Sequence, residues 1–268
     1  MEYTKRLAEF CAGVEFSQLP ADVVGKVKLC VLDFAANVYG SHELEAVRAI
    51  ADFVRGSSDC EKATAFGCGF KCCVSKAAFM NGVGGEAIEA QDGLRFGGNH
   101  PGAAVIPAAL AVGEKARTGG KKVIEAIAAG YEAANRISAA IHPFHTMSGF
   151  LPTGTCGTFG AAVAAAKLVG ADEQQMLNAI GNAGFVLPIS MAEHLMGGYT
   201  CKIVQGGQAA SAGITASALA AAGITSPPYV LEGSKLNGGF TQITTGAKPD
   251  LDRITGDLGE KYSIMDVY

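Results

Sequence analysis

Apolar residues recur at steps of three and four positions through most of the chain. Between residues 19 and 39, Val23, Val27 and Phe34 share one apolar face, and Gly40 follows as a stop signal. This spacing predicts an amphipathic helix. Comparable patterns predict further helices over residues 46–54, 75–83, 103–116, 122–141, 160–170 and 206–222. Another helix is expected to open at Asp172, with Gln175 completing a capping box.

Two glycine-rich stretches interrupt this helical pattern and are predicted to be loops, one over residues 84–102 and one over about 148–160. Strand signals are nearly absent before residue 240, and no alternation of strands with helices and no nucleotide-binding glycine fingerprint is found. The sequence therefore predicts an all-α, multi-helix bundle over residues 1–261. Residues 262–268 are strand-like, and are expected either to pair elsewhere in the chain or to begin a missing or separately encoded domain.

Composition supports a folded chain with a large buried surface. Of the 268 residues, 49% are hydrophobic and only 17% are charged, which argues against disorder and favours extensive burial within the fold or in an oligomer. No apolar run is long enough for a transmembrane helix, and the first residues lack the layout of a secretory signal. A cytoplasmic location is therefore expected, with no membrane partner.

Charge and cysteine usage argue against nucleic-acid binding and against a zinc site. The net charge is −4 and no basic run is present, so nucleic acid is not an expected partner. The eight cysteines are expected to be mostly reduced thiols. The cluster at residues 68–73, CGFKCC, has the one metal-like spacing, but adjacent Cys72 and Cys73 would point apart in a regular element and no histidine is nearby. Buried or surface thiols are favoured there over a zinc site.

Candidate chemistry is concentrated first in the acidic loop from Glu86 to Gly102, EAIEAQDGLRFGGNHPG. A histidine near a carboxylate can act as a tuned acid or base, and an arginine can fork onto a substrate carboxylate. The candidates for these roles are Glu86, Glu89, Asp92, Arg95 and His100. The alternative interpretation is a polar surface loop in which Asp92 caps a turn and His100 is a spacer before Pro101.

The second glycine-rich region, residues 142–160, brings hydroxyl groups and two histidines close to a predicted helix start. Thr153 and Thr155 are candidate anion ligands there. His142 and His145 flank Pro143, and a catalytic role and a helix-terminal pair with solvated rings both remain open. Cys156 lies near the same helix start, and is expected to be a packing residue because no base partner is evident.

A third place is marked by Lys202, which lies between two diglycines in a small, apolar stretch, HLMGGYTCKIVQGG. A single cation beside a cleft can bind a carboxylate. The alternative is a lysine that extends along a helix surface to reach water.

Several long motifs occur together in one order and resemble the helical domain of the MmgE/PrpD family. This family includes 2-methylcitrate dehydratase, cis-aconitate decarboxylase and iminodisuccinate epimerase. The motifs are LPADVV at 19–24, VLDFAANVYG at 31–40, the stretch from Asn81-Gly82 to Asp92-Gly93, HPGAAVIPAALAVGE at 100–114, GYEAANRI at 130–137, GFLPTGTCGTFGAAVAAAKLVG at 149–170, Lys202 with GGQAA, and LEG at 231–233.

The resemblance implies a helical domain plus a smaller α+β lid domain, with an active site between them. In most members of the family it implies no metal and no organic cofactor. It implies proton transfer next to a carboxylate of a small di- or tricarboxylic acid. By resemblance, Glu89 and Asp92 are the acidic loop positions, His100 is the loop histidine and Lys202 is the anion-binding lysine. Relatives carry a histidine where this chain has Leu151, and His145 is the residue expected to reach the same space.

The family's lid domain continues beyond the point where this chain ends. The leading expectation is therefore a dehydratase-like lyase or isomerase component acting on a small polycarboxylate, completed by a second polypeptide and forming a homodimer. The alternatives are an inactive helical scaffold that binds a metabolite or partner, and a fragment of a longer enzyme.

Overall fold

The computed structural model describes residues 2–58, 60–246 and 248–268, and most of them are helical. The all-α prediction is confirmed. The longer helices are α1 (Tyr3–Gly13), α2 (Ala21–Ser41), α3 (Glu45–Gly56), α4 (Val74–Glu86), α5 (Gly102–Ala116), α6 (Gly120–Ile141), α8 (Pro152–Leu168), α9 (Glu173–Val186) and α11 (Gln205–Ala221). Shorter turns are α7 (Phe144–Met147), α10 (Glu193–Met196), α12 (Phe240–Ile243), α13 (Asp252–Thr255), η1 (Phe16–Gln18), η2 (Thr200–Val204) and η3 (Ser263–Asp266).

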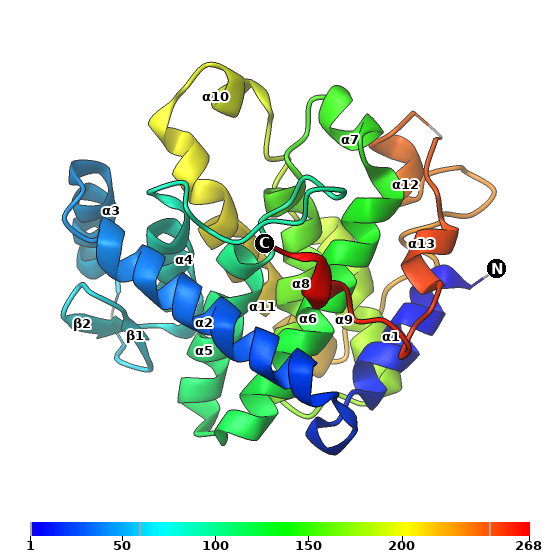
Figure 1. The fold of residues 1–268 in the computed structure, drawn as a ribbon, viewed down its shortest axis with the longest axis horizontal. Coiled ribbons are helices and arrows are strands. Elements are labelled where there is room, and N and C mark those ends of the chain that lie inside the picture. The colour runs from blue at the N-terminus through cyan, green and yellow to red at the C-terminus, as the bar shows by residue number, and fades with distance from the viewer. Residues whose placement is uncertain (1, 59, 247) are drawn as a thin grey trace.

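Helix α8 forms the centre of the bundle, and every residue from Pro152 to Leu168 is buried. It packs against α5, α6, α9 and α11, while α2 crosses the front of the molecule and α3 lies at one side (Figure 1). A helix that is buried all round needs apolar or small residues on every face. The run of alanine, glycine and threonine in α8 meets this need and lets the neighbouring helices come close.

Glycines make the closest of these helix contacts possible. A Cβ added to Gly160 would lie 2.6 Å from the carbonyl oxygen of Gly130 and 2.8 Å from Ala134 Cβ. One added to Gly82 would lie 2.6 Å from the Cα of Gly207, where α4 meets α11. Real side chains do not tolerate such separations. The glycine content therefore serves helix packing as well as turns.

Both predicted loops are shorter than expected, because some of their glycines pack inside helices. Helix α4 continues to Glu86, two residues beyond the start of the predicted loop at residue 84, because Gly85 lies against the ring of Phe34. Helix α8 begins at Pro152, well inside the predicted loop at 148–160, because Gly157 lies against Ala104. In both places the glycines belong to a helix face that touches another helix.

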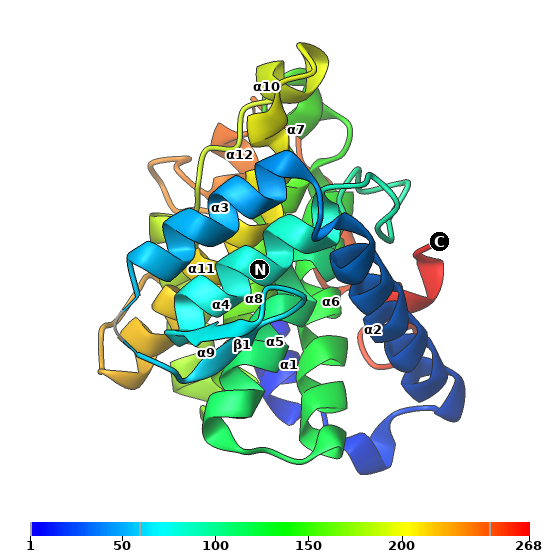
Figure 2. The same ribbon diagram turned by 90° about the vertical axis from the view of Figure 1, so that its left-hand side faces the viewer.

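The sequence predicted the start of α9 correctly but did not predict three other elements. The capping box at α9 is confirmed, since the Gln175 N–H donates to Asp172 Oδ1 (2.7 Å) and the Asp172 N–H donates to Gln175 Oε1 (3.1 Å). Helix α1 and a small antiparallel hairpin, β1 (Ala63–Ala65) and β2 (Phe70–Cys72), were not predicted. Strands of three residues give too little alternation to detect. The hairpin covers α4 and α5 at one edge of the molecule (Figure 2).

The last residues differ from the strand expected over 262–268. Ser263–Asp266 forms the 3₁₀ turn η3, because the Ser263 hydroxyl donates to the buried carboxylate of Glu132 (2.7 Å) and Ile264 is fully buried. Only Tyr268 pairs as a strand residue would, exchanging two backbone hydrogen bonds with Gly93 (3.2 and 3.1 Å). Both ribbon views place this end beside the loop after α4 (Figures 1 and 2).

Within the described ranges, no helix combines the length and the apolarity needed to cross a lipid bilayer. All eight cysteines are free thiols. Cys72 is buried and Cys73 is half-buried, and no cluster of three or more histidine, cysteine, aspartate or glutamate side chains with metal-site geometry is found among the residues that the structure describes.

The packing account predicts opposite effects for two helical glycines replaced by alanine. Gly160→Ala should lower the free energy of unfolding by roughly 2 kcal/mol or more, because its Cβ would meet backbone and side-chain atoms of α6. Gly25→Ala, in α2, meets nothing within 4 Å and should raise it by about 0.5–1 kcal/mol through helix propensity. Urea denaturation of both variants tests this, and equal effects would contradict it.

Candidate active site

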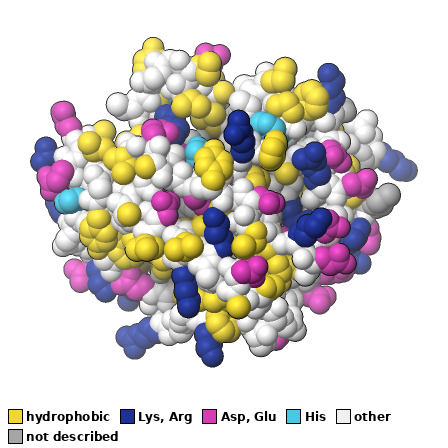
Figure 3. Space-filling model, viewed as in Figure 1, with side chains coloured by type: hydrophobic (Ala, Val, Ile, Leu, Met, Phe, Trp, Pro, Cys, Tyr) yellow, Lys and Arg dark blue, Asp and Glu magenta, His cyan; other side chains and the backbone are white. Residues whose placement is uncertain are grey.

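The predicted chemical residues gather where several helix ends meet. The C-terminal end of α4 and the N-terminal ends of α5 and α11 lie under the loop of residues 87–101, close to the start of α8. In the space-filling view, a basic, an acidic and a histidine side chain lie together beside a hollow over this loop and the start of α11 (Figure 3). Three helix N-termini at one place make an environment that favours negative charge.

Lys202 is the cation at this place. It lies in η2, its side chain is 7% exposed, and its Nζ donates to both carboxylate oxygens of Glu89, at 2.7 Å for Oε2. A second carboxylate oxygen, Glu86 Oε1, lies 3.5 Å from the same Nζ. Burying a lysine ammonium costs free energy of desolvation, which is offset only if the charge is paired. These two carboxylates supply that pairing.

Glu86 is fully buried at the end of α4. Its Oε1 accepts from the Gln205 side-chain amide (2.7 Å) and its Oε2 accepts from the Gly206 N–H (2.8 Å) at the start of α11. A Cβ at Gly206 would lie 2.8 Å from Oε2, so glycine leaves the space for this carboxylate. Burial raises the pKa of Glu86 to about 7, and the nearby Lys202 ammonium opposes that rise. Glu86 can therefore change its protonation near neutral pH.

Glu89 differs from Glu86 in exposure and in backbone conformation. Its side chain is 54% exposed, and its φ is +55°, in the left-handed region that non-glycine residues rarely adopt. Such a conformation costs about 1 kcal/mol or more. It turns the chain back after α4 and directs the carboxylate of Glu89 onto Lys202.

Asp92 anchors the loop through a second buried carboxylate. The Tyr131 hydroxyl donates to its Oδ2 (2.6 Å) and the Gly102 N–H at the start of α5 donates to its Oδ1 (3.0 Å). Here too glycine is needed, since a Cβ on Gly102 would lie 2.6 Å from Oδ1. Burial raises the pKa of Asp92 to about 6, against the opposing hydrogen bonds. No hydrogen bond joins its carboxylate to His100 among the described contacts.

His100 is oriented by backbone groups. Its Nδ1 lies 2.8 Å from the carbonyl oxygen of Asp92, and its own N–H donates to Thr153 Oγ1 (2.9 Å). A carbonyl only accepts, so Nδ1 carries the proton in this arrangement and Nε2 of a neutral ring is free to accept one. Burial lowers the pKa of His100, and Lys202 and Glu89 are both near enough to shift it in opposite directions. The ring is therefore suited to act as a base.

The residues predicted near the second loop have internal partners. Thr153 accepts from the His100 N–H, which ties the start of α8 to the site. Thr155 Oγ1 lies 2.8 Å from Nε2 of His145, and both side chains are fully buried. The ring of His145 stacks on Phe150, with centroids 5.1 Å apart, and burial lowers its pKa to about 4. His145 therefore lies in an aromatic part of the interior, away from solvent.

The remaining residues that the sequence analysis singled out lie either in a separate groove or in the core. Arg95 is exposed and lines a separate groove of about 860 Å³ beside η3 and α13, together with Arg136 and Arg253. Cys156 is fully buried and its pKa is raised to about 12 by burial, which fits the packing role predicted for it. Leu151 is 7% exposed and immediately precedes α8.

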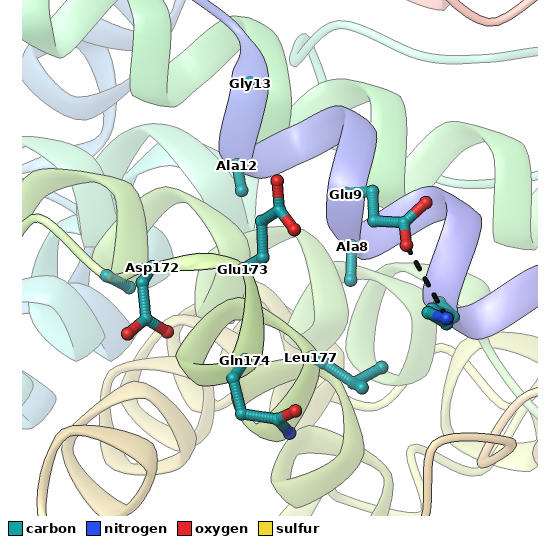
Figure 4. Close-up of a pocket in the computed structure, with 10 residues that line it drawn as sticks. Ala8, Glu9, Ala12, Gly13, Asp172, Glu173, Gln174 and Leu177 are labelled. Carbon is teal, nitrogen blue, oxygen red and sulfur yellow. Dashed lines mark ion pairs between the residues drawn. The ribbon is translucent and has the colours of Figure 1, made fainter.

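Two further pockets lie outside the cluster around Lys202. One of about 580 Å³ lies between α1 and the start of α9 and is lined by Glu9, Asp172 and Glu173, with Lys5 paired to Glu9 (Figure 4). Its three carboxylates would repel a polycarboxylate. Another, of about 380 Å³, is lined by residues of the segment that precedes Lys202, among them His194 in α10 and Tyr199 just before η2.

The structure brings the acidic loop, His100 and Lys202 together in one region, and three of their partners have no role in the sequence-based prediction. Glu86 stood within the candidate loop without a role assigned to it. Gln205 and Tyr131 were not singled out at all. The signal available for Gln205 was its position directly before a diglycine at a helix start, and Tyr131 lies inside a helix whose register alone does not show which loop it faces.

Comparison with known proteins gives two matches. Residues 5–252 match the MmgE/PrpD N-terminal domain. A cis-aconitate decarboxylase-like protein, oryM, from Aspergillus oryzae (strain ATCC 42149 / RIB 40) is 26% identical over 281 aligned positions, which cover 98% of this chain and 57% of the relative. The chain thus spans little more than half the length of this curated relative.

The buried carboxylate of Glu86 predicts a pH dependence of stability. Its pKa is about 7 in the folded chain against 4.5 ordinarily, so the folded state holds this proton more tightly than the unfolded state does. The resulting stabilisation is complete below pH 4.5 and is lost as the pH rises through 7. Between pH 5 and pH 8 the wild type should lose on the order of 2–3 kcal/mol more than Glu86→Gln, which cannot titrate.

Urea denaturation of both proteins across this pH range measures the difference. Asp92, whose pKa is also raised, is present in both proteins, so its contribution cancels. Parallel pH profiles for the wild type and Glu86→Gln would show that Glu86 is ionised throughout and contradict the account.

Proposed function

Since the chain belongs to the MmgE/PrpD family, we propose that it supplies the helical half of an active site that moves a proton next to a carboxylate of a small di- or tricarboxylic acid. The reaction class is a dehydratase- or decarboxylase-type lyase, or an isomerase. The observation that carries the proposal is the cluster of Lys202, Glu89 and His100, where a buried cation lies beside two groups able to accept a proton.

Lys202 holds a carboxylate of the substrate in this proposal. Removing a proton next to a carboxylate builds negative charge on that carboxylate, so a fixed cation stabilises the transition state more than the ground state. The N-termini of α5, α8 and α11 add partial positive charge on the same side. These groups are held by the bundle and need no rearrangement when charge develops.

His100 is the proposed general acid or base, acting through Nε2. Its Nδ1–H is fixed by the Asp92 carbonyl, so the ring presents one defined nitrogen to the substrate side. Glu89 is the second group that can transfer a proton, and Asp92 positions the loop that carries both. Separate groups for proton removal and for the departing or arriving group are what a lyase or an isomerase requires.

The site is completed by further residues outside this chain in our proposal. The chain spans 57% of its curated relative, whose printed name points to an unsaturated tricarboxylic acid as the kind of substrate to test first. We propose that a lid domain, on a second polypeptide, closes over the loop of residues 87–101.

We also propose that the chain forms a homodimer in the cytoplasm. Its outer surface supports self-association, because Leu29, Leu32 and Tyr39 lie along one face of α2 and are 63%, 66% and 57% exposed. Hydrophobic side chains follow this helix across the front of the molecule in the space-filling view (Figure 3).

A second candidate function is binding of the same carboxylic acids without turnover. Leu151 favours it, because the family resemblance implies a histidine at this position and leucine cannot transfer a proton. His145 does not compensate in this structure, because its ring is fully buried and its Nε2 is engaged by Thr155. Turnover by the complete enzyme separates the two functions.

The proposal predicts distinct losses for His100 and Lys202. In the protein purified together with any chain that accompanies it in its own cells, His100→Asn should lower kcat by roughly 10²–10⁴-fold through loss of proton transfer. Lys202→Met should raise KM and also lower kcat, because the cation binds the substrate carboxylate and stabilises the charge that develops on it in the transition state. Lys71→Met, on an exposed lysine of β2 paired with Glu114, serves as the control and should change neither.

The measurement is steady-state turnover of a panel of small di- and tricarboxylic acids, with circular dichroism to show that each variant is folded. Unchanged kcat in His100→Asn would remove His100 from the mechanism. Binding of the acids with no turnover by the complete assembly would favour the second candidate function.

A further inference from the structure

Lys202 has more negative charge around it than one ammonium can neutralise. Its Nζ contacts both oxygens of Glu89 and lies 3.5 Å from Glu86 Oε1. With both carboxylates ionised, the three side chains carry a net charge of −1. A substrate carboxylate that binds to the same cation brings a further negative charge to a place that already has an excess.

The two carboxylates are not equivalent in how they can respond to an arriving anion. Glu89 is 54% exposed and can turn into water with its charge intact. Glu86 is fully enclosed between α4 and α11, held by Gln205 and the Gly206 N–H, and has no path to solvent that keeps those bonds. Glu86 can relieve repulsion only by binding a proton.

Few charged side chains lie close enough to Glu86 to affect its ionisation. Lys202 from η2 and Glu89 from the loop are the charged side chains that act on it among the described residues. Helix α5 presents Ala103 beside Gly206, and α11 presents Gln205 and Gly206.

From α2, the uncharged side chains of Phe34, Val38 and Ser41 contact Gly84 and Gly85 at the end of α4. His100 lies near Lys202 and Glu89 and is the other titratable group of the cluster.

We propose that Glu86 takes up a proton when a small polycarboxylate anion binds at Lys202, so that substrate binding is coupled to proton uptake by this buried carboxyl group. The inference rests on the proposed function and adds a role for a residue that touches Lys202 and the start of α11. Protonation of Glu86 removes one negative charge from the cluster, and Glu89 turns into water, so that the Lys202 ammonium is free for the incoming carboxylate.

The free-energy difference between the two forms of Glu86 is small at neutral pH. Burial already raises the pKa of Glu86 to about 7 with Lys202 beside it. An additional anion at Lys202 disfavours the ionised form further, and so raises this pKa again. Proton uptake on binding is therefore expected to be greatest about one pH unit above neutrality, where the free chain has mostly lost the proton and the bound chain holds it.

Glutamine is a suitable mimic of the protonated form. Its side chain has the size of glutamic acid, and its oxygen can accept from the Gly206 N–H. Its amide can donate to Gln205 Oε1 once the Gln205 amide is turned over, and Ser190, which now donates to that oxygen at 3.3 Å, has a hydroxyl that can accept instead. The substitution thus keeps the hydrogen bonds and removes the titration.

The experiment is isothermal titration calorimetry on the protein purified together with any chain that accompanies it in its own cells. The ligand is propane-1,2,3-tricarboxylate, a tricarboxylate without a hydroxyl or double bond to react. At pH 8 all its carboxyl groups are ionised, so any proton taken up is taken up by the protein. Titration in two buffers of different ionisation enthalpy gives the number of protons bound per anion. Wild type, Glu86→Gln, His100→Asn and Glu125→Gln are compared, the last being a carboxylate at the far end of α6 paired with Lys122.

The wild type and Glu125→Gln should take up close to one proton per anion at pH 8, and their affinity should fall nearly tenfold per pH unit above about pH 7.5. Glu86→Gln should take up almost none, bind more tightly than the wild type at pH 8 and show a flat pH profile. His100→Asn should retain the uptake.

Four outcomes overturn the inference. Undiminished uptake in Glu86→Gln would show that another group binds the proton, and loss of uptake in His100→Asn alone would assign it to the histidine. Binding with no proton uptake in the wild type would contradict the coupling but leave the proposed function standing. Absence of binding in every protein, at pH 6 as well as pH 8, would contradict the proposed function itself and the inference with it.

Discussion

The helices around α8 approach one another so closely that a single added methyl group would collide with a neighbouring backbone. Gly160 against the carbonyl of Gly130, and Gly82 against Gly207, show the limit of this approach. Such contacts fix both the rotation and the axial position of each helix, because a shift in either brings a larger side chain into the contact. The ends of α4, α5, α8 and α11 are therefore brought to one place by the same packing that forms the core.

The same use of glycine forms the electrostatics of the site. Gly102 and Gly206 lie at helix starts, and each leaves room for a buried carboxylate that its own N–H then binds, Asp92 in one case and Glu86 in the other. Burial raises the pKa of both carboxyl groups, while Lys202 supplies the cation that offsets part of the charge. A cluster with more carboxylates than cations, in which Glu86, Asp92 and Lys202 are buried, responds to pH and to an added anion far more than a surface ion pair would.

The sequence predicted the fold class, most helices and the general region of the site, because these depend on local periodicity and on residue types within one loop. It misjudged glycine where the reason for glycine lies in another helix, as at Gly85 and Gly157. It missed Tyr131 and Gln205 for the same reason, since their partners are distant in sequence. The burial of His145 among aromatic rings also depends on tertiary packing, because a histidine two residues after Pro143 is equally consistent with an exposed position.

The central claim is that Lys202 receives a carboxylate of a small polycarboxylate anion. A crystal structure of the chain soaked with propane-1,2,3-tricarboxylate tests it most directly. The account predicts a carboxylate of the ligand within hydrogen-bond distance of Lys202 Nζ, with Glu89 moved off the ammonium and His100 facing the ligand. Density in the groove lined by Arg95 and Arg253, with the contacts between Lys202 and Glu89 intact, would contradict it.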